Sequence, residues 1–103
     1  NTRVFQNYQK NRFSLGKLMR LDKYLKVSKL IKRRTQAQVA CKNNRVYLNN
    51  HLAKSSSMVK VGDEIKIVSP VMMLRVKVLQ IPVNNQYSDD LFSVIEQKKL
   101  ETE

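Results

Sequence analysis

Positive charge is concentrated in one stretch of this chain. Residues 19–60 contain eleven lysines and arginines and a single acid, Asp22, whereas residues 61–103 contain five basic and seven acidic residues. The formal net charge of the whole chain is +12. Because so many like charges repel one another, they lower the stability of a compact fold. A polyanionic partner offsets that repulsion, so the pattern favours nucleic acid. A solvated basic face and an anionic membrane surface are the alternatives.

The composition limits the classes of protein that remain. A length of 103 residues suits one domain, and a hydrophobic content of 42% is enough for a packed core. The single cysteine, Cys41, excludes an internal disulfide and fits a reducing compartment, so we expect a cytoplasmic protein. No apolar run approaches the roughly 18 residues of a membrane-spanning helix. One histidine and one cysteine are too few for a zinc site, and we expect no metal and no cofactor.

The N-terminal segment differs from the rest. Residues 1–18 are polar, contain four basic residues and no acid, and show no hydrophobic repeat. We expect a flexible basic extension. Met19 is a candidate for the natural start of the chain, in which case residues 1–18 would not be native.

A first helix is predicted over residues 20–31. Apolar residues at positions 21, 24 and 25 follow the i, i+3, i+4 spacing of one helical face. Lys23 and Lys26 point away from that face, toward solvent or a ligand. Asp22 falls in the first turn, where a negative charge suits the helix dipole.

A second helix is predicted over residues 36–42. Thr35 and Gln38 have the spacing of a capping box, in which Thr35 is the N-cap. Arg33 and Arg34 precede this cap, where positive charge is unfavourable because the helix dipole is already positive there. Arginines beside exposed helical N–H groups therefore predict a phosphate pocket. The alternative is that both arginines extend into solvent.

Strands and turns follow the second helix. Residues 46–48 alternate in character, and Asn49-Asn50 suits a two-residue hairpin turn with positive φ. Gly62 marks a second turn before a strand that contains residues 65–67. The longest strand is predicted over residues 73–81, where apolar side chains alternate with Arg75 and Lys77. These two basic residues form a weaker candidate patch for binding, and we favour the alternative that they belong to a solvated sheet face.

The C-terminal region is predicted to end in a helix. Residues 82–87 suggest a loop, and Ser88-Asp89-Asp90 resembles a helix start. Leu91, Phe92 and Ile95 would share one face of a helix that continues to about Lys99. The predicted fold class is therefore α+β, with two N-terminal helices on a short antiparallel sheet, followed by a C-terminal strand and helix.

Four segments resemble the S4 RNA-binding domain in their order and spacing. They are RLDKYL at 20–25, RTQA at 34–37, NRVYLNN at 44–50 and VKVGDEI at 59–65. Asn44 and Asn50 stand where that family usually has glycine, and asparagine is the residue that best tolerates positive φ after glycine. The resemblance implies an S4 core over residues 19–69, flanked by the extension 1–18 and a C-terminal addition over 70–103.

The run from 19 to 35 is similar to one S4 subgroup, the stand-alone S4 proteins of bacterial ribosome-associated quality control, which are related to the small heat-shock S4 protein. The resemblance implies binding to obstructed large ribosomal subunits that hold peptidyl-tRNA, with contacts to large-subunit rRNA and the P-site tRNA. It also implies support for a tailing factor that adds C-terminal alanines to the stalled chain. Arg20 and Arg34 match RNA-contacting arginines of the subgroup, and Asp22 matches its first-helix acid.

We expect the RNA-binding residues to form one surface. They are Arg20, Lys23, Lys26, Arg33, Arg34, Arg45 and Tyr47. Arginine forks suit bidentate phosphate contacts, and structured RNA is bound mainly through its shape, phosphates and 2′-hydroxyls. The Tyr47 ring either stacks on an unpaired base or packs against a lysine stem.

No arrangement of nucleophile, base and acid is visible, so we expect a non-enzyme. His51 follows the hairpin turn without a catalytic partner, and Cys41 lies on the apolar stripe of the second helix. We expect a monomer that binds neither DNA nor membrane. Two other functions stay open: a heat-shock or assembly factor on free large subunits, and an adaptor for acidic proteins.

Overall fold

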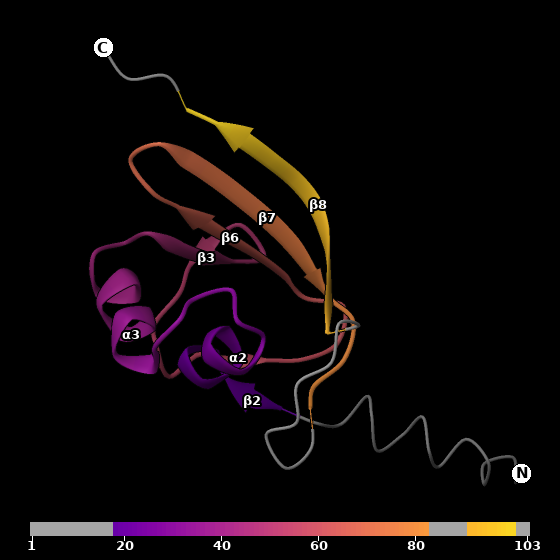
Figure 1. Cartoon of the computed structure of the whole chain (residues 1–103). Helices are drawn as coiled ribbons and strands as arrows, with labels where there is room; N and C mark the ends of the chain where they lie inside the picture. Colours follow the sequence, from indigo (N-terminus) through magenta and orange to yellow (C-terminus); the bar gives the residue numbers. More distant parts are fainter. Residues whose placement is uncertain (1–17, 83–90, 101–103) are drawn as a thin grey trace, which may run out of the picture.

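The structure is a computed structural model that describes residues 18–82 and 91–100 (Figure 1). Residues 1–17 of the predicted extension 1–18, the segment 83–90 and residues 101–103 lie outside the described residues. The described part contains two helices and seven strands. They are β2 (Met19–Arg20), α2 (Leu21–Val27), α3 (Arg34–Lys42), β3 (Val46–Leu48), β4 (His51–Leu52), β5 (Met58–Val59), β6 (Glu64–Val68), β7 (Met72–Val78) and β8 (Phe92–Lys99). Neither of these two helices has the length and apolar character that crossing a membrane requires.

The strands form two antiparallel sheets. The larger sheet has five strands in the order β4-β3-β6-β7-β8, and the smaller sheet pairs β2 with β5. The predicted hairpin is confirmed, since Asn49 and Asn50 have φ values of 53° and 70° between β3 and β4. Gly62 has a φ of 96° in the turn before β6, and Asn44 has a φ of 61° after α3. Both asparagines that replace the usual glycines therefore take the left-handed conformation that glycine would favour.

Both predicted helices are present with shifted bounds. The first was expected over residues 20–31, but α2 ends at Val27 and Lys29 takes a φ of 66°. The second begins at Arg34 with Arg33 as its N-cap, and no side chain makes a capping hydrogen bond. The prediction of a capping box was therefore wrong. Gln38, which would have completed that box, instead donates a hydrogen bond to Asp22 in the other helix.

The C-terminal helix was predicted wrongly. Residues 92–99 form β8, which pairs with β7 along its length, while Ser88-Asp89-Asp90 lie outside the described residues. A bulge explains the misleading periodicity: Arg75 pairs with Glu96 and Val76 pairs with Val94, so Ile95 is an extra residue. The inserted residue interrupts the two-residue alternation of a strand and produces a spacing typical of a helix.

The hydrophobic core lies between the helices and one face of the five-stranded sheet (Figure 1). Its largest fully buried side chains come from both layers and include Leu21, Tyr24, Leu25, Val46, Ile65 and Val76. The Tyr24 hydroxyl donates a 2.7 Å hydrogen bond to the carbonyl oxygen of Leu91, directly before β8. This buried bond fixes the C-terminal strand to the first helix. The expected two helices on an antiparallel sheet are confirmed, and the opposite face of the sheet carries neither described helix.

Candidate nucleic-acid interface

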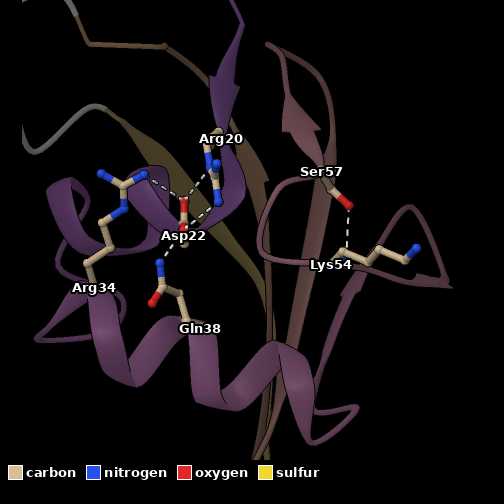
Figure 2. Close-up of polar contacts among 6 residues, drawn as sticks. All are labelled: Arg20, Asp22, Arg34, Gln38, Lys54 and Ser57. Atoms are coloured by element: carbon tan, nitrogen blue, oxygen red, sulfur yellow. Dashed lines mark hydrogen bonds and ion pairs between the residues drawn. The ribbon is translucent and has the colours of Figure 1, made fainter.

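The buried carboxylate of Asp22 joins residues from both helices (Figure 2). Arg20 Nε and Nη2 donate to Oδ1 and Oδ2 of Asp22 at 3.3 and 3.2 Å. Arg34 Nη2 lies 3.3 Å from Asp22 Oδ1, and the Gln38 amide donates to Oδ2 at 2.9 Å. The Asp22 side chain has no exposed surface, whereas Arg20 and Arg34 keep 46% and 43% of theirs. We call these four residues the Asp22 cluster.

Asp22 is ionised at neutral pH. Burial opposes the charged form, but hydrogen bonds from Gln38, Arg20 and Arg34, together with the charge of Arg34, outweigh burial and hold the pKa of the Asp22 carboxyl below its ordinary value. One negative charge thus lies between two positive ones. The positive charge at the start of α3 is partly compensated inside the protein, which the sequence argument did not foresee. The cluster still has a net charge of about +1, and both guanidinium groups remain accessible.

The loop over residues 54–57 fixes the start of α2. The backbone N–H groups of Leu21 and Asp22 donate to the carbonyls of Ser57 and Ser55 at 2.7 and 3.2 Å. Within the loop, the Lys54 N–H donates to Ser57 Oγ at 2.9 Å (Figure 2). Two of the backbone N–H groups that a helix start leaves without an intrahelical partner are therefore already paired in α2.

Three other predicted site residues lie on the same helices. Lys23 is half-buried and Lys26 is exposed on α2, and Arg33 is the exposed N-cap of α3. Within residues 18–82 and 91–100, no carboxylate forms an ion pair with any of the three. Their charges are therefore available to a ligand approaching the helices.

Arg45 and Tyr47 lie elsewhere. Val46 is buried under the helices, and side chains alternate along a strand, so its two neighbours face the other side of the sheet. Lys66 Nζ lies 4.5 Å from the centroid of the Tyr47 ring, as in the predicted packing against a lysine. The structure therefore brings Arg20 and Arg34 together but separates Arg45 and Tyr47 from them.

A groove beside the Asp22 cluster contains two cations that the sequence analysis missed. Its volume is about 360 Å³, and its lining residues are Gln38, Cys41, Lys42, Lys54 and Ser55. Lys42 follows Gln38 by one helical turn, a spacing that could have identified it. Lys54 is brought there by the loop that fixes α2, which no local pattern indicates.

The groove has no visible reactive group. Burial, together with the nearby charge of Asp22, raises the pKa of the Cys41 thiol, so this cysteine is neutral and belongs to the core. Across the described ranges, no group of three or more His, Cys, Asp or Glu side chains could hold a metal ion. The arrangement can bind anions through accessible arginines and lysines.

Comparison with known sequences identifies related proteins. The S4 domain family matches residues 19–65. The RQC P-site tRNA stabilizing factor of Streptococcus pneumoniae is 41% identical over 85 residues, covering 81% of this chain and 97% of that protein. The protein of the same name from Bacillus subtilis is 37% identical over 84 residues, covering 80% of this chain and 98% of that protein.

Two solved structures share the fold. The solution structure of hypothetical protein HP1423 has a TM-score of 0.62 and 32% identity, and the match covers 82% of this chain and all of that one. The trimeric structure of Vibrio cholerae Heat Shock Protein 15 has a TM-score of 0.65 over 76% of this chain and 82% of that one. Its identity of 21% limits that likeness to the fold.

Proposed function

Because the chain belongs to the family of RQC P-site tRNA stabilizing factors, we propose that it binds RNA on large ribosomal subunits during ribosome-associated quality control. Its ligands are large-subunit rRNA and the tRNA in the P site of an obstructed subunit. By holding that tRNA, it supports a tailing factor that adds C-terminal alanines to the stalled chain. It acts as a monomer in the cytoplasm and by binding alone.

The observation that carries this proposal is the convergence of Arg20 and Arg34 on Asp22. A buried, ionised carboxylate holds both guanidinium groups in place while leaving more than two fifths of each side chain exposed. Pre-orientation reduces the conformational entropy that each arginine loses when it contacts a phosphate. Asp22 is thus an orienting acid rather than a ligand.

Further basic residues extend the proposed interface beyond the Asp22 cluster. Lys23, Lys26 and Arg33 lie on the same two helices, and Lys42 and Lys54 flank the adjoining groove. Such cations attract RNA without reading its bases, because phosphates carry most of the binding free energy. Specificity for an obstructed subunit then arises from shape, since such a subunit presents rRNA and a P-site tRNA side by side.

Co-sedimentation tests the proposal. Large subunits with and without P-site peptidyl-tRNA are incubated with the full chain, with an Arg34→Gln variant and with a Lys99→Gln control that removes one charge far from the cluster. We use glutamine because Arg34→Glu would place a second carboxylate beside buried Asp22. The proposal expects preference for tRNA-bearing subunits, at least tenfold weaker binding by Arg34→Gln, and no change in the control. Equal binding by both variants would contradict it.

A deletion strain tests the pathway. Loss of alanine tails on non-stop reporter proteins, restored by the wild-type chain but not by Arg34→Gln, is the expected result. Intact tails in the deletion strain would instead favour a role on free large subunits. RNA binding that acidic peptides compete away would favour an adaptor for acidic proteins.

A further inference from the structure

The face of the five-stranded sheet that points away from α2 and α3 has its own pattern of side chains. The register aligns Tyr47 with Lys66, Lys66 with Arg75, and Arg75 with Glu96 across four strands. Their chain neighbours Val46, Ile65 and Val76 are fully buried under the helices, so this row lies on the opposite side of the sheet. The same alternation adds Arg45, Glu64, Lys77 and Lys98. We call this surface the outer sheet face.

The outer sheet face carries an excess of positive charge. Its cations are Arg45, Lys66, Arg75, Lys77 and Lys98, and its acids are Glu64 and Glu96. Both acids are engaged by one residue, since Arg75 Nε lies 4.0 Å from Glu64 and Arg75 Nη2 lies 3.7 Å from Glu96. Among the residues described, no carboxylate forms an ion pair with Lys77 or Lys98, and both are exposed.

The centre of this face combines a cation with an aromatic ring. Lys66 Nζ lies 4.5 Å from the Tyr47 ring centroid, and both side chains are partly exposed. An ammonium held over a ring keeps its remaining donors for an outside acceptor, because the ring contacts only one side of it. Phosphate oxygens suit these donors, and the sugars and bases of RNA suit the ring beside them.

We propose that the outer sheet face is a second RNA-binding surface, which contacts the phosphates of an RNA segment different from the one held at the Asp22 cluster. This inference rests on the proposed function. The two basic surfaces lie on opposite sides of the sheet. A single RNA strand would therefore have to pass around an edge of the sheet to contact both. The chain therefore joins two RNA segments, and Lys66, Lys77 and Lys98 supply the contacts on the sheet side. For Lys77, this proposal favours the candidate patch over the solvated face that the sequence analysis preferred.

Adjacent lysines of β8 provide a matched test. Lys98 pairs with Met73 on the outer sheet face, whereas Lys99 pairs with Met72 and alternates to the other side. The double variant Lys77→Ala/Lys98→Ala is compared with Lys99→Ala for binding to large subunits that carry P-site peptidyl-tRNA, over a series of salt concentrations. Each lost phosphate contact should lower the slope of log affinity against log salt by about one. We expect a decrease of about two for the double variant and roughly five- to tenfold weaker binding, with Lys99→Ala unchanged.

The outcomes separate this inference from the proposed function. If Arg34→Gln abolishes binding while Lys77→Ala/Lys98→Ala binds like the wild type with the same salt slope, the second surface is refuted and the proposed function stands. If the wild-type chain binds no RNA, both fail. A double variant that keeps its RNA affinity but loses binding to an acidic protein would assign the face to a protein partner and refute the RNA proposal. Thermal unfolding of each variant ensures that lost binding is not lost folding.

Discussion

Arg34 Nη2 lies 3.3 Å from Asp22 Oδ1, although the two residues lie in the first turns of different helices and are twelve positions apart. The contact joins α2 to α3 and directs a guanidinium that would otherwise be free in solvent. It also partly compensates the positive charge at the start of α3, where the sequence places cations near a positive helix end. One buried acid thus contacts both arginines and joins the two helices.

Replacement of Asp22 by asparagine should separate these two roles. The variant loses a buried acceptor for three side chains, so the free energy of unfolding should fall by about 1–3 kcal/mol, measured by urea denaturation. RNA binding should weaken even though the net charge rises by one, because Arg20 and Arg34 lose their common anchor. Asp63→Asn is the matched control, since it removes the same charge from a buried acid that contacts Lys60 and Asn49 instead. Stronger binding by Asp22→Asn would show that charge alone matters.

Protonation of Asp22 and Asp63 should lower the free energy of unfolding at acidic pH. Both carboxyls are partly desolvated, yet hydrogen bonds and nearby cations hold the pKa of each below its ordinary value of 3.8. The unfolded chain therefore takes up protons first as the pH falls. The stabilising contribution is complete above the ordinary value and is lost as the pH falls through the folded-state pKa. Urea midpoints between pH 7 and pH 2 should drop in this range, and less steeply in Asp22→Asn. Parallel profiles for that variant and the wild type would contradict the assignment.

The two asparagines of the hairpin turn should respond oppositely to glycine. Both have positive φ, but among the described residues only the Asn49 side chain makes hydrogen bonds: its amide donates to Asp63 at 3.1 Å, and its Oδ1 accepts the Glu64 N–H at 2.9 Å. Asn50→Gly should raise the free energy of unfolding by roughly 0.5 kcal/mol, because Asn-Gly is the preferred pair in this turn. Asn49→Gly should lower it by about 1–2 kcal/mol through the lost hydrogen bonds. Chemical denaturation of both variants measures the difference.

Tyr24→Phe should loosen the C-terminal strand. The hydroxyl is buried and donates to the Leu91 carbonyl, which the variant leaves without this partner. We expect a loss of about 1–2 kcal/mol in the free energy of unfolding and faster amide hydrogen exchange in β8 than in α3. A uniform change of exchange across the chain would mean that the bond does not specifically hold β8.

Features with local causes were predictable from the sequence. The Asn49-Asn50 turn and Gly62 depend on backbone preferences of single residues, and the alternation along β7 reflects one buried face. Features that depend on contacts between residues far apart in the sequence were not predictable from it. The bulge at Ile95 exists only because β8 pairs with β7. Gln38 does not form the expected capping box because its amide donates to Asp22 in another helix.

The same distinction applies to the interface. Arg20 and Arg34 were identified through their motif, but their meeting at one buried acid depends on how the helices pack. Arg45 and Tyr47 were assigned to the same surface as the helix residues because sequence proximity does not show which side of a sheet a residue faces. Lys54 could not be predicted as a groove residue, because its loop lies beside the groove only in the folded chain.

Ultraviolet cross-linking of the full chain to RNA in cells, followed by sequencing of the bound fragments, tests the central claim most directly. We predict that tRNA and large-subunit rRNA are recovered together, and that the combined variant Arg20→Gln/Arg34→Gln recovers neither above background. Recovery dominated by messenger RNA, or undiminished recovery of tRNA and rRNA by that variant, would contradict the account.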